Sequence, residues 1–260
     1  MAKQSVSDPA VEFLKARAIA DLGQRCGFVA PRPLSYQEDS GTILFERVPT
    51  PVSLIAVVTG AALDDESVVL ALLAVSGRAL GAIHRHLDLD QIPQDPLPAQ
   101  VGRFLQPTLQ SRLVEEAIDA PVVGHGDFGT ANLYLTSADP ARARVVVLDP
   151  FPNFYSSFHA AAWESRYLDL ALFDTCLVRG SVRSFLTLDA GWVHAMRSAF
   201  IGGYREVAGV EVDLRVLGAV SDAVLASYLT LRRRWPSTAA SVGARLVGLR
   251  RRIRRGGCTR

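Results

Sequence analysis

The chain has 260 residues, of which 49% are apolar and 21% charged, so it is long and apolar enough to fold around a sizeable core. This composition excludes a disordered or fibrous protein as the general state. The net charge of +2 conceals a separation, because residues 231–260 hold ten arginines and no acid, and the other 230 residues therefore carry a net charge of −8.

The first element predicted in chain order is a short helix over residues 13–22, which ends at Gly27. Its apolar face is formed by Leu14, Ala18, Ile19 and Leu22. Strands are expected over residues 33–36 and 42–48, and the polar segment between them has the composition of a turn, so the pair should form a hairpin. Residues 1–50 thus form a small part of mixed helix and strand.

The remainder, residues 51–260, is mainly helical in pattern. The predicted elements there are helices over 67–87, 101–117 and from Arg166 onward, and two short strands over 133–135 and 144–148. We therefore expect an α+β fold in two parts, 1–50 and 51–260, with the Pro-bounded joint between them as a candidate cleft.

The segment most informative about chemistry is residues 125–132, which read His-Gly-Asp-Phe-Gly-Thr-Ala-Asn. Phosphoryl transfer from a nucleoside triphosphate needs a carboxylate that orients the acceptor hydroxyl, and hard oxygen ligands that hold magnesium against the phosphates. Asp127 can face the acceptor while Asn132 turns toward the metal. If residues 133–148 form a hairpin, the chain returns to its start, and Asp149 can share one ion with Asn132.

This constellation resembles the kinase-like phosphotransferases, which include aminoglycoside phosphotransferases, choline kinases and related small-molecule kinases. The likeness extends, in the same chain order, to the helix end at residues 80–84 and to the Asp-Leu-Ala helix start at residues 169–171. It implies a protein-kinase-like two-lobed fold, with a reduced N-terminal lobe and a mainly helical C-terminal lobe. It also implies magnesium- and ATP-dependent phosphorylation of a hydroxyl on a small molecule.

By this similarity, Asp127 would be the catalytic base, and Asn132 and Asp149 would be the magnesium ligands. His125 and Asp169 would brace the catalytic loop by hydrogen bonds rather than contact substrate.

The nucleotide would contact a hinge at the end of the second N-terminal strand, where the resemblance points to Glu46 and Val48. Lys3 would stand for the lysine that the family carries on an N-terminal strand. The family pairs that lysine with a helix glutamate, whose expected place falls at or near Lys15, and Glu12 is the nearest acid.

The chain departs from the family in having no room for a glycine-rich hairpin before this lysine, and in lacking the usual glycine after Asp149. Three explanations stay open: a truncated lobe, a start upstream of Met1, or a nucleotide held differently. The departures also keep open a second function, that of a catalytically silent kinase-like nucleotide-binding or scaffold protein. His84 and His86 lie at a helix end, where the helix dipole favours a cationic ring, and we expect no chemistry from them.

The arginine-rich tail, residues 231–260, has two interpretations. Leu246, Leu249 and Ile253 fall on one side of a helix, which could dock on the acidic body or lie in the interface of an anionic membrane. We favour docking and do not expect nucleic acid as a partner. Since the tail would repel a polycation, a neutral or anionic acceptor fits the charge better. Acceptor identity and oligomeric state stay open.

The compartment is predicted from what the sequence lacks. Its three cysteines, at positions 26, 176 and 258, are isolated and follow no metal-binding spacing, which argues against a disulfide scaffold or a zinc module. No signal-peptide pattern opens the chain, and the longest uncharged stretch, residues 48–63, contains two prolines. We expect a soluble cytoplasmic protein.

Overall fold

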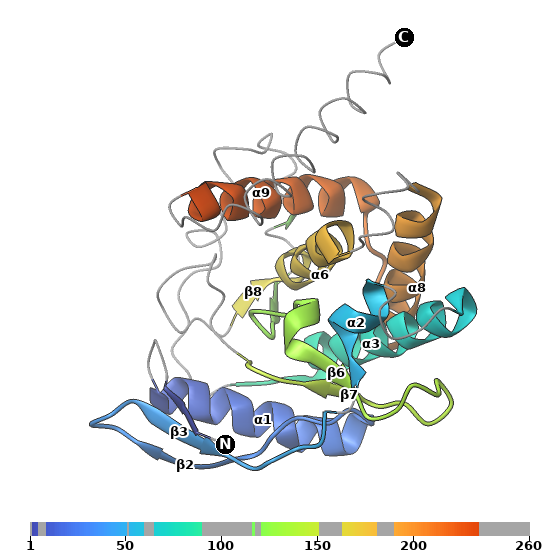
Figure 1. The fold of residues 1–260 in the computed structure, drawn as a ribbon. Coiled ribbons are helices and arrows are strands. Elements are labelled where there is room, and N and C mark those ends of the chain that lie inside the picture. The colour runs from blue at the N-terminus through green and yellow to red at the C-terminus, as the bar shows by residue number, and fades with distance from the viewer. Residues whose placement is uncertain are drawn as a thin grey trace.

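A computed structural model describes most of the chain (Figure 1). The described residues are 2–4, 9–50, 52–59, 65–89, 116–117, 121–150, 163–180 and 190–233. The predicted helix over 101–117 lies almost wholly outside them. The arginine-rich tail beyond Arg233 lies outside them as well.

The N-terminal part is a three-stranded antiparallel sheet with a helix packed on it. Strands β1 (Ala2–Gln4), β3 (Thr42–Phe45) and β2 (Pro33–Gln37) lie in that order. The predicted hairpin is confirmed as β2–β3, although its second strand ends at Phe45 rather than residue 48. β1 pairs with β3 along its three residues and carries Lys3, which the resemblance likened to the lysine of an N-terminal strand of the family.

Helix α1 (Pro9–Cys26) is longer than predicted and ends before Gly27, whose φ of +82° favours glycine. The predicted apolar face is wrong at Leu14, which is 41% exposed. The face that packs into the protein instead includes two charged residues, Glu12 and Lys15. The predicted face is confirmed at Ile19 and Leu22, and it lacked the two charged residues that are buried with them.

A second antiparallel sheet holds β4 (Val52–Ser53), β6 (Leu133–Leu135) and β7 (Val145–Val147), in that order. This confirms the predicted hairpin of residues 133–148. The segment after α1 joins the same sheet, because Val29 exchanges hydrogen bonds with β7 at 2.8 Å on each side. Short helix α2 (Leu54–Val58) and the 3-10 turn η1 (Thr130–Asn132) flank β6.

The rest of the described chain is helical apart from one strand pair. The helices are α3 (Glu66–His86), α6 (Arg166–Gly180), α8 (Ala190–Ala208) and α9 (Leu214–Arg233), and β5 (Pro121–Val123) pairs antiparallel with β8 (Trp163–Ser165). In Figure 1, α1 and its sheet lie at one end of the molecule and α9 at the other, with β6, β7 and the remaining helices between them. The prediction of a helix over 67–87 is confirmed, and that of helices beyond Arg166 is confirmed over α6, α8 and α9, while residues 181–189 and 234–260 lie outside the described residues.

Helices α3 and α8 pack so closely that their backbones are in direct contact. A Cβ placed on Gly77 of α3 would lie 2.0 Å from the carbonyl oxygen of Phe200, and one on Gly203 of α8 would lie 2.1 Å from that of Ala74. Only glycine permits so close a contact. Among the described residues, α3 is the one helix apolar and long enough to cross a membrane, and 56% of that window is buried inside the protein, as in a core helix.

Candidate functional site

Asp127 and Asn132 face each other across one tight loop, residues 124–132, called here the Asp127 loop. It leaves β5, turns through η1 and enters β6. The side-chain amide nitrogen of Asn132, Nδ2, donates to the Asp127 carboxylate oxygen Oδ2 at 2.8 Å and to the Asp127 carbonyl oxygen at 3.0 Å. Because the nitrogen is committed to Asp127, the amide oxygen of Asn132 is the atom that can face a cation.

Asp149 follows the β6–β7 hairpin, which returns the chain toward this pair. The β6–β7 hairpin returns the chain so that the amide of Leu148 donates to the carbonyl oxygen of Asn132 at 2.9 Å. The next residue, Asp149, is exposed and has a φ of +57°, a left-handed conformation that costs energy for a residue with a Cβ. Strain of this kind is held in place by surrounding structure and is common at functional sites.

His125 is a fully buried ring that ties the Asp127 loop to β7. Its Nδ1 accepts from the amide of Asp127 at 3.2 Å, so its Nε2–H is the donor to the carbonyl oxygen of Leu148 at 3.1 Å. Burial lowers the pKa of His125 to about 4, and the positive charge of Lys15 acts in the same direction, against the acids at 169 and 149. The ring is therefore neutral at physiological pH.

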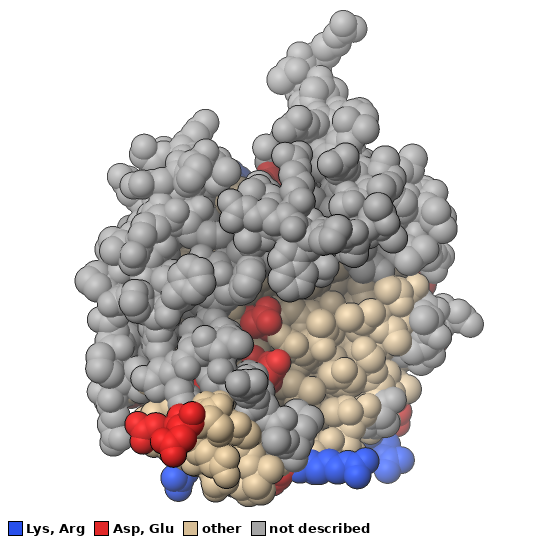
Figure 2. All heavy atoms as spheres, turned by 60° about the vertical axis from the view of Figure 1, so that its left-hand side comes forward, with Lys and Arg blue, Asp and Glu red and all other residues tan. Residues whose placement is uncertain are grey.

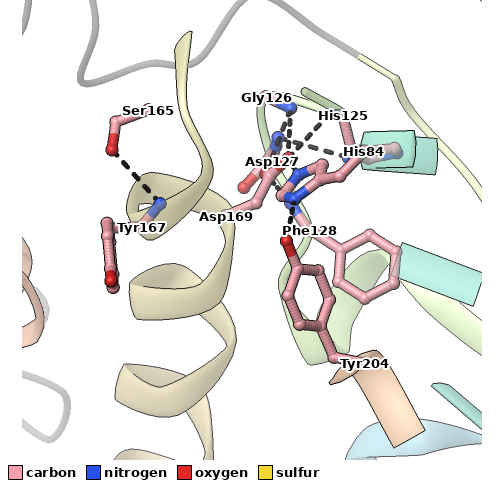
Figure 3. Close-up of polar contacts among 9 residues, drawn as sticks. All are labelled: His84, His125, Gly126, Asp127, Phe128, Ser165, Tyr167, Asp169 and Tyr204. Atoms are coloured by element: carbon pink, nitrogen blue, oxygen red, sulfur yellow. Dashed lines mark hydrogen bonds and ion pairs between the residues drawn. The ribbon is translucent and has the colours of Figure 1, made fainter. Parts of the chain in front are cut away.

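Asp169, on the first turn of α6, is a fully buried carboxylate that gathers the backbone amides of the Asp127 loop (Figure 3). It accepts from His125 N at 2.6 Å, from Gly126 N at 3.1 Å and from Phe128 N at 3.2 Å. Gly126 has a φ of +94°, which the loop requires and which favours glycine. Hydrogen bonds to a carboxylate are stronger than neutral ones, so this one side chain fixes three of the peptide units of the loop.

Phe128 anchors the same loop on its apolar side. Its ring is fully buried, lies edge-on to His125 with centroids 5.5 Å apart, and contacts a pair of stacked rings, Phe173 and Phe200, whose centroids are 3.7 Å apart. The loop is thus held by polar contacts to α6 and by aromatic contacts to α6 and α8.

His84 and Tyr204 also belong to this network, and sequence reasoning assigned no role to either of them. His84 lies at the end of α3 with its side chain 1% exposed, and its ring nitrogens lie 3.2 Å from Asp169 Oδ2 and 3.0 Å from the Tyr204 hydroxyl. The prediction of a cationic ring at a helix end is wrong, because burial lowers the pKa of His84. A signal was present: a histidine and a tyrosine on otherwise apolar helix faces need a polar partner.

The burial of two charged residues of α1 was not predicted from the sequence. Glu12 and Lys15 are 1% and 4% exposed, three residues apart and therefore on one side of the helix. Ile19 and Leu22 continue that side into the main core, which also contains β6 and β7. The charge of Lys15 lowers the pKa of both buried histidines, 84 and 125. Lys15 thus lies on the side of α1 that faces the Asp127 loop.

The residues predicted to contact nucleotide lie in the N-terminal sheet and just after it. The amide of Glu46 donates to Arg32 O at 2.9 Å, and the Glu46 carboxylate accepts from Arg32 N at 3.0 Å, so the end of β3 is fixed to the start of β2. Val48 follows in the connection to β4. Lys3 lies on β1 opposite Ile43 of β3.

A magnesium ion would find suitable donors in the amide oxygen of Asn132 and the carboxylate of Asp149. Within the described residues, no group of three or more histidine, cysteine, aspartate or glutamate side chains is placed to hold a metal. Magnesium is commonly held by one or two protein ligands together with substrate phosphates and water, and the donor pair here suits that mode. Figure 2 shows acidic side chains exposed near the middle of one face of the molecule.

Comparison with known proteins bears on this geometry. No family model matches the chain, and no curated protein matches it in sequence. An aminoglycoside phosphotransferase from Streptomyces rimosus, solved with ADP and streptomycin, is 18% identical with a TM-score of 0.52, and the match covers 86% of this chain and 85% of that one. The chain has the protein-kinase-like fold of small-molecule phosphotransferases.

Two further solved structures share this kinase-like fold. A glucosamine kinase solved with glucosamine, ADP and inorganic phosphate is 16% identical with a TM-score of 0.63, covering 95% of this chain and 74% of that one. A choline/ethanolamine kinase family protein from Mesorhizobium loti is 15% identical with a TM-score of 0.51, covering 95% and 78%. The resemblance predicted from the sequence is confirmed at the level of the fold.

Proposed function

We propose that the chain is a magnesium- and ATP-dependent phosphotransferase that phosphorylates a hydroxyl group of a small molecule. The observation that carries this proposal is the grouping of three oxygen-bearing side chains on two short connected elements. Asn132 donates to Asp127 at 2.8 Å, and the amide of Leu148, the residue before Asp149, donates to the carbonyl oxygen of Asn132 at 2.9 Å. The kinase-like fold supports the same reading.

In the proposed mechanism, the Asp127 carboxylate orients the acceptor hydroxyl and takes its proton. The acceptor oxygen forms a bond to the γ-phosphorus as the bond from that phosphorus to the β,γ-bridging oxygen breaks, and ADP leaves with the electron pair. Asn132 and Asp149 would hold magnesium, which supplies positive charge to offset the charge on the phosphates. The hydrogen bond from Asn132 keeps the Asp127 carboxylate directed toward the acceptor.

The proposed nucleotide site lies between a reduced N-terminal lobe and a helical C-terminal lobe. The three-stranded sheet with α1 would be the reduced lobe, and Glu46 and Val48, which follow β3, would form the hinge that contacts adenine. Lys3 on β1 would reach the phosphates. Since Glu12 is buried on the side of α1 that faces the protein, it is the carboxylate that we propose as the partner of this lysine.

The acceptor is proposed as a neutral or anionic alcohol, such as a sugar or nucleoside-type alcohol. The glucosamine kinase supports a sugar-sized acceptor for this fold, and the phosphotransferase from Streptomyces rimosus was solved with an aminoglycoside. Ten arginines within residues 231–260 make a polycationic acceptor less favourable on electrostatic grounds.

A second candidate function is a catalytically silent nucleotide-binding or scaffold protein. The short N-terminal sheet favours it, because its order β1–β3–β2 contains no glycine-rich hairpin among the described residues. The complete set Asp127, Asn132 and Asp149 favours the enzyme instead.

The Asp127→Asn variant separates the two candidates. It keeps the size of the side chain and removes the proton acceptor, so nucleotide binding should persist while turnover falls by about 10² to 10⁴, the usual range for general base catalysis. The assay is ATP consumption with a panel of sugar, amino-alcohol and nucleoside acceptors. Wild type that binds ATP without turning over any acceptor would favour the scaffold.

The metal ligands are tested by thermal stability. ATP at about 100 times its dissociation constant should stabilise the wild type by roughly 2.7 kcal/mol, and only when magnesium is present. Asp149→Ala should abolish this shift while leaving the apo protein folded. Asp139→Ala is the matched control, because Asp139 is an exposed carboxylate in the turn of the same hairpin. An undiminished shift in Asp149→Ala would contradict the assignment.

A further inference from the structure

Tyr204, His84 and Asp169 form a buried chain of hydrogen bonds that joins helices α8, α3 and α6 (Figure 3). A carboxylate can only accept, so the His84 nitrogen 3.2 Å from Asp169 Oδ2, which is Nε2, carries the hydrogen. In the neutral ring, Nδ1 is then an acceptor. The Tyr204 hydroxyl, 3.0 Å away, therefore donates to it.

The surroundings of the chain keep this polarity fixed. Tyr204 and Asp169 are fully buried, and the His84 side chain is 1% exposed. Burial lowers the pKa of His84, and the charges of Arg166 and Lys15 act in the same direction, against the opposing effect of Asp169. Burial also raises the pKa of Tyr204, so the hydroxyl keeps its proton.

Asp169 Oδ2 is shared between this chain and the Asp127 loop. The same oxygen accepts from His84 Nε2 and, at 2.6 Å, from His125 N, while Oδ1 accepts from the amides of Gly126 and Phe128. The orientation of the carboxylate is therefore set by the ring together with three amides. Removing the ring would take away one of the contacts that orient Asp169, and a change in that orientation would alter the hydrogen bonds to the three amides.

We infer that His84 and Tyr204 are positioning residues for the proposed catalytic base: Tyr204 orients His84, His84 orients Asp169, and Asp169 sets the loop that carries Asp127. This inference rests on the proposed function for its kinetic consequence. Its structural consequence, order in the Asp127 loop, does not depend on that function.

Three substitutions separate the links of the chain. His84→Phe keeps a ring of similar size and removes both nitrogens, whereas His84→Gln places an amide donor near the position of Nε2 and should restore much of the contact to Asp169. Tyr204→Phe removes only the hydroxyl. Thr175→Val is the control, since Thr175 is a fully buried residue of α6 whose hydroxyl donates to the carbonyl oxygen of Ser221 on α9 at 3.4 Å.

The first measurement is amide hydrogen exchange of the full chain, which needs no activity. In His84→Phe, the amides of His125, Gly126 and Phe128 should exchange at least tenfold faster than in Thr175→Val at matched global stability. His84→Gln should lie between His84→Phe and wild type. Exchange in the loop that rises equally in Thr175→Val, or does not rise in His84→Phe, would overturn the inference. If His84→Phe does not fold, Tyr204→Phe provides the same comparison.

The second measurement is steady-state kinetics. We expect kcat to fall about 10- to 100-fold in His84→Phe with the KM for ATP within about threefold of wild type, and to fall less in Tyr204→Phe. Adding Tyr204→Phe to His84→Phe should cost nothing further, because the two act in series. Additive losses, or a loss in KM alone, would overturn the positioning role. A wild type without activity but with the expected exchange pattern would reject the proposed function and leave the structural link standing.

Discussion

The contact between α3 and α8 predicts that replacing each of two neighbouring glycines of α8, Gly202 and Gly203, by alanine changes the free energy of unfolding in opposite directions. A Cβ added at Gly203 would lie 2.1 Å from the carbonyl oxygen of Ala74, with the carbonyl carbon and Cα of Ala74 also within 2.9 Å. All three atoms are backbone, so no rotamer change relieves the clash. Reaching an ordinary contact of 3.4 Å requires the helices to move apart by about 1.3 Å at this point.

Overpacking of this kind usually costs about 1 to 3 kcal/mol, and rigid backbone on the far side places Gly203→Ala at the upper end. Replacing glycine by alanine within a helix returns at most about 1 kcal/mol. We therefore expect Gly203→Ala to lower the free energy of unfolding by about 2 kcal/mol. At about 2 to 4 °C for each kcal/mol in a protein of this size, Tm should fall by about 4 to 8 °C.

Gly202 is the matched control, because it lies in the same helix, is exposed, and would meet no atom within 4 Å of an added Cβ. Gly202→Ala should raise stability by up to about 1 kcal/mol through helix propensity alone. Thermal unfolding followed by circular dichroism measures both variants. Equal shifts, or a stable Gly203→Ala, would refute the close approach of α3 and α8.

Two further predictions concern buried histidine and the junction between α1 and β7. The pKa of His125 is about 4 in the folded protein against about 6.5 in the unfolded chain, so the unfolded state binds more protons between these values, and stability is lost as pH falls from 6.5 to 4. This shift in pKa contributes about 3 kcal/mol to the free energy of unfolding above pH 6.5. Urea unfolding between pH 6.5 and 4 should therefore show a smaller loss of stability in His125→Asn than in the wild type. Arg144→Ala should lower the free energy of unfolding by about 1 kcal/mol in the same assay, because the guanidinium donates to the carbonyl oxygens of Gly27 and Phe28 at 3.1 and 3.0 Å, whereas the exposed Arg142→Ala should be neutral.

The elements that sequence reasoning predicted well are those whose partners are near in the chain. The β6–β7 hairpin and the β2–β3 hairpin each pair residues separated by a short polar turn, so period and turn composition suffice. The Asp127 loop was found for a similar reason. Asp127 and Asn132 are five residues apart, and the β6–β7 hairpin alone returns the chain at Asp149 toward Asn132.

What could not be predicted depends on contacts between distant segments. His84 meets Asp169 across 85 positions and Tyr204 across 120, and no local pattern marks such a pair. The buried face of α1 was predicted only in part, because it carries Glu12 and Lys15, which a hydrophobic period counts as surface. β1 and β4, of three and two residues, are strands only through their partners.

The proposed metal ligands are positioned by contacts that are local in the chain, whereas the proposed base depends on contacts between distant segments. Asn132 and Asp149 are set by a hairpin that would keep its register if the helices shifted slightly. The orientation of the Asp127 loop, however, depends on Asp169, which is held through the ring of His84 by the hydroxyl of Tyr204. Tyr204 is the residue next to Gly203, at the point where α8 touches α3. Three hydrogen bonds in series therefore connect the α3–α8 contact to the loop that carries the proposed base, although neither helix supplies a proposed metal ligand. A change in the separation of α3 and α8 should alter turnover more than metal binding.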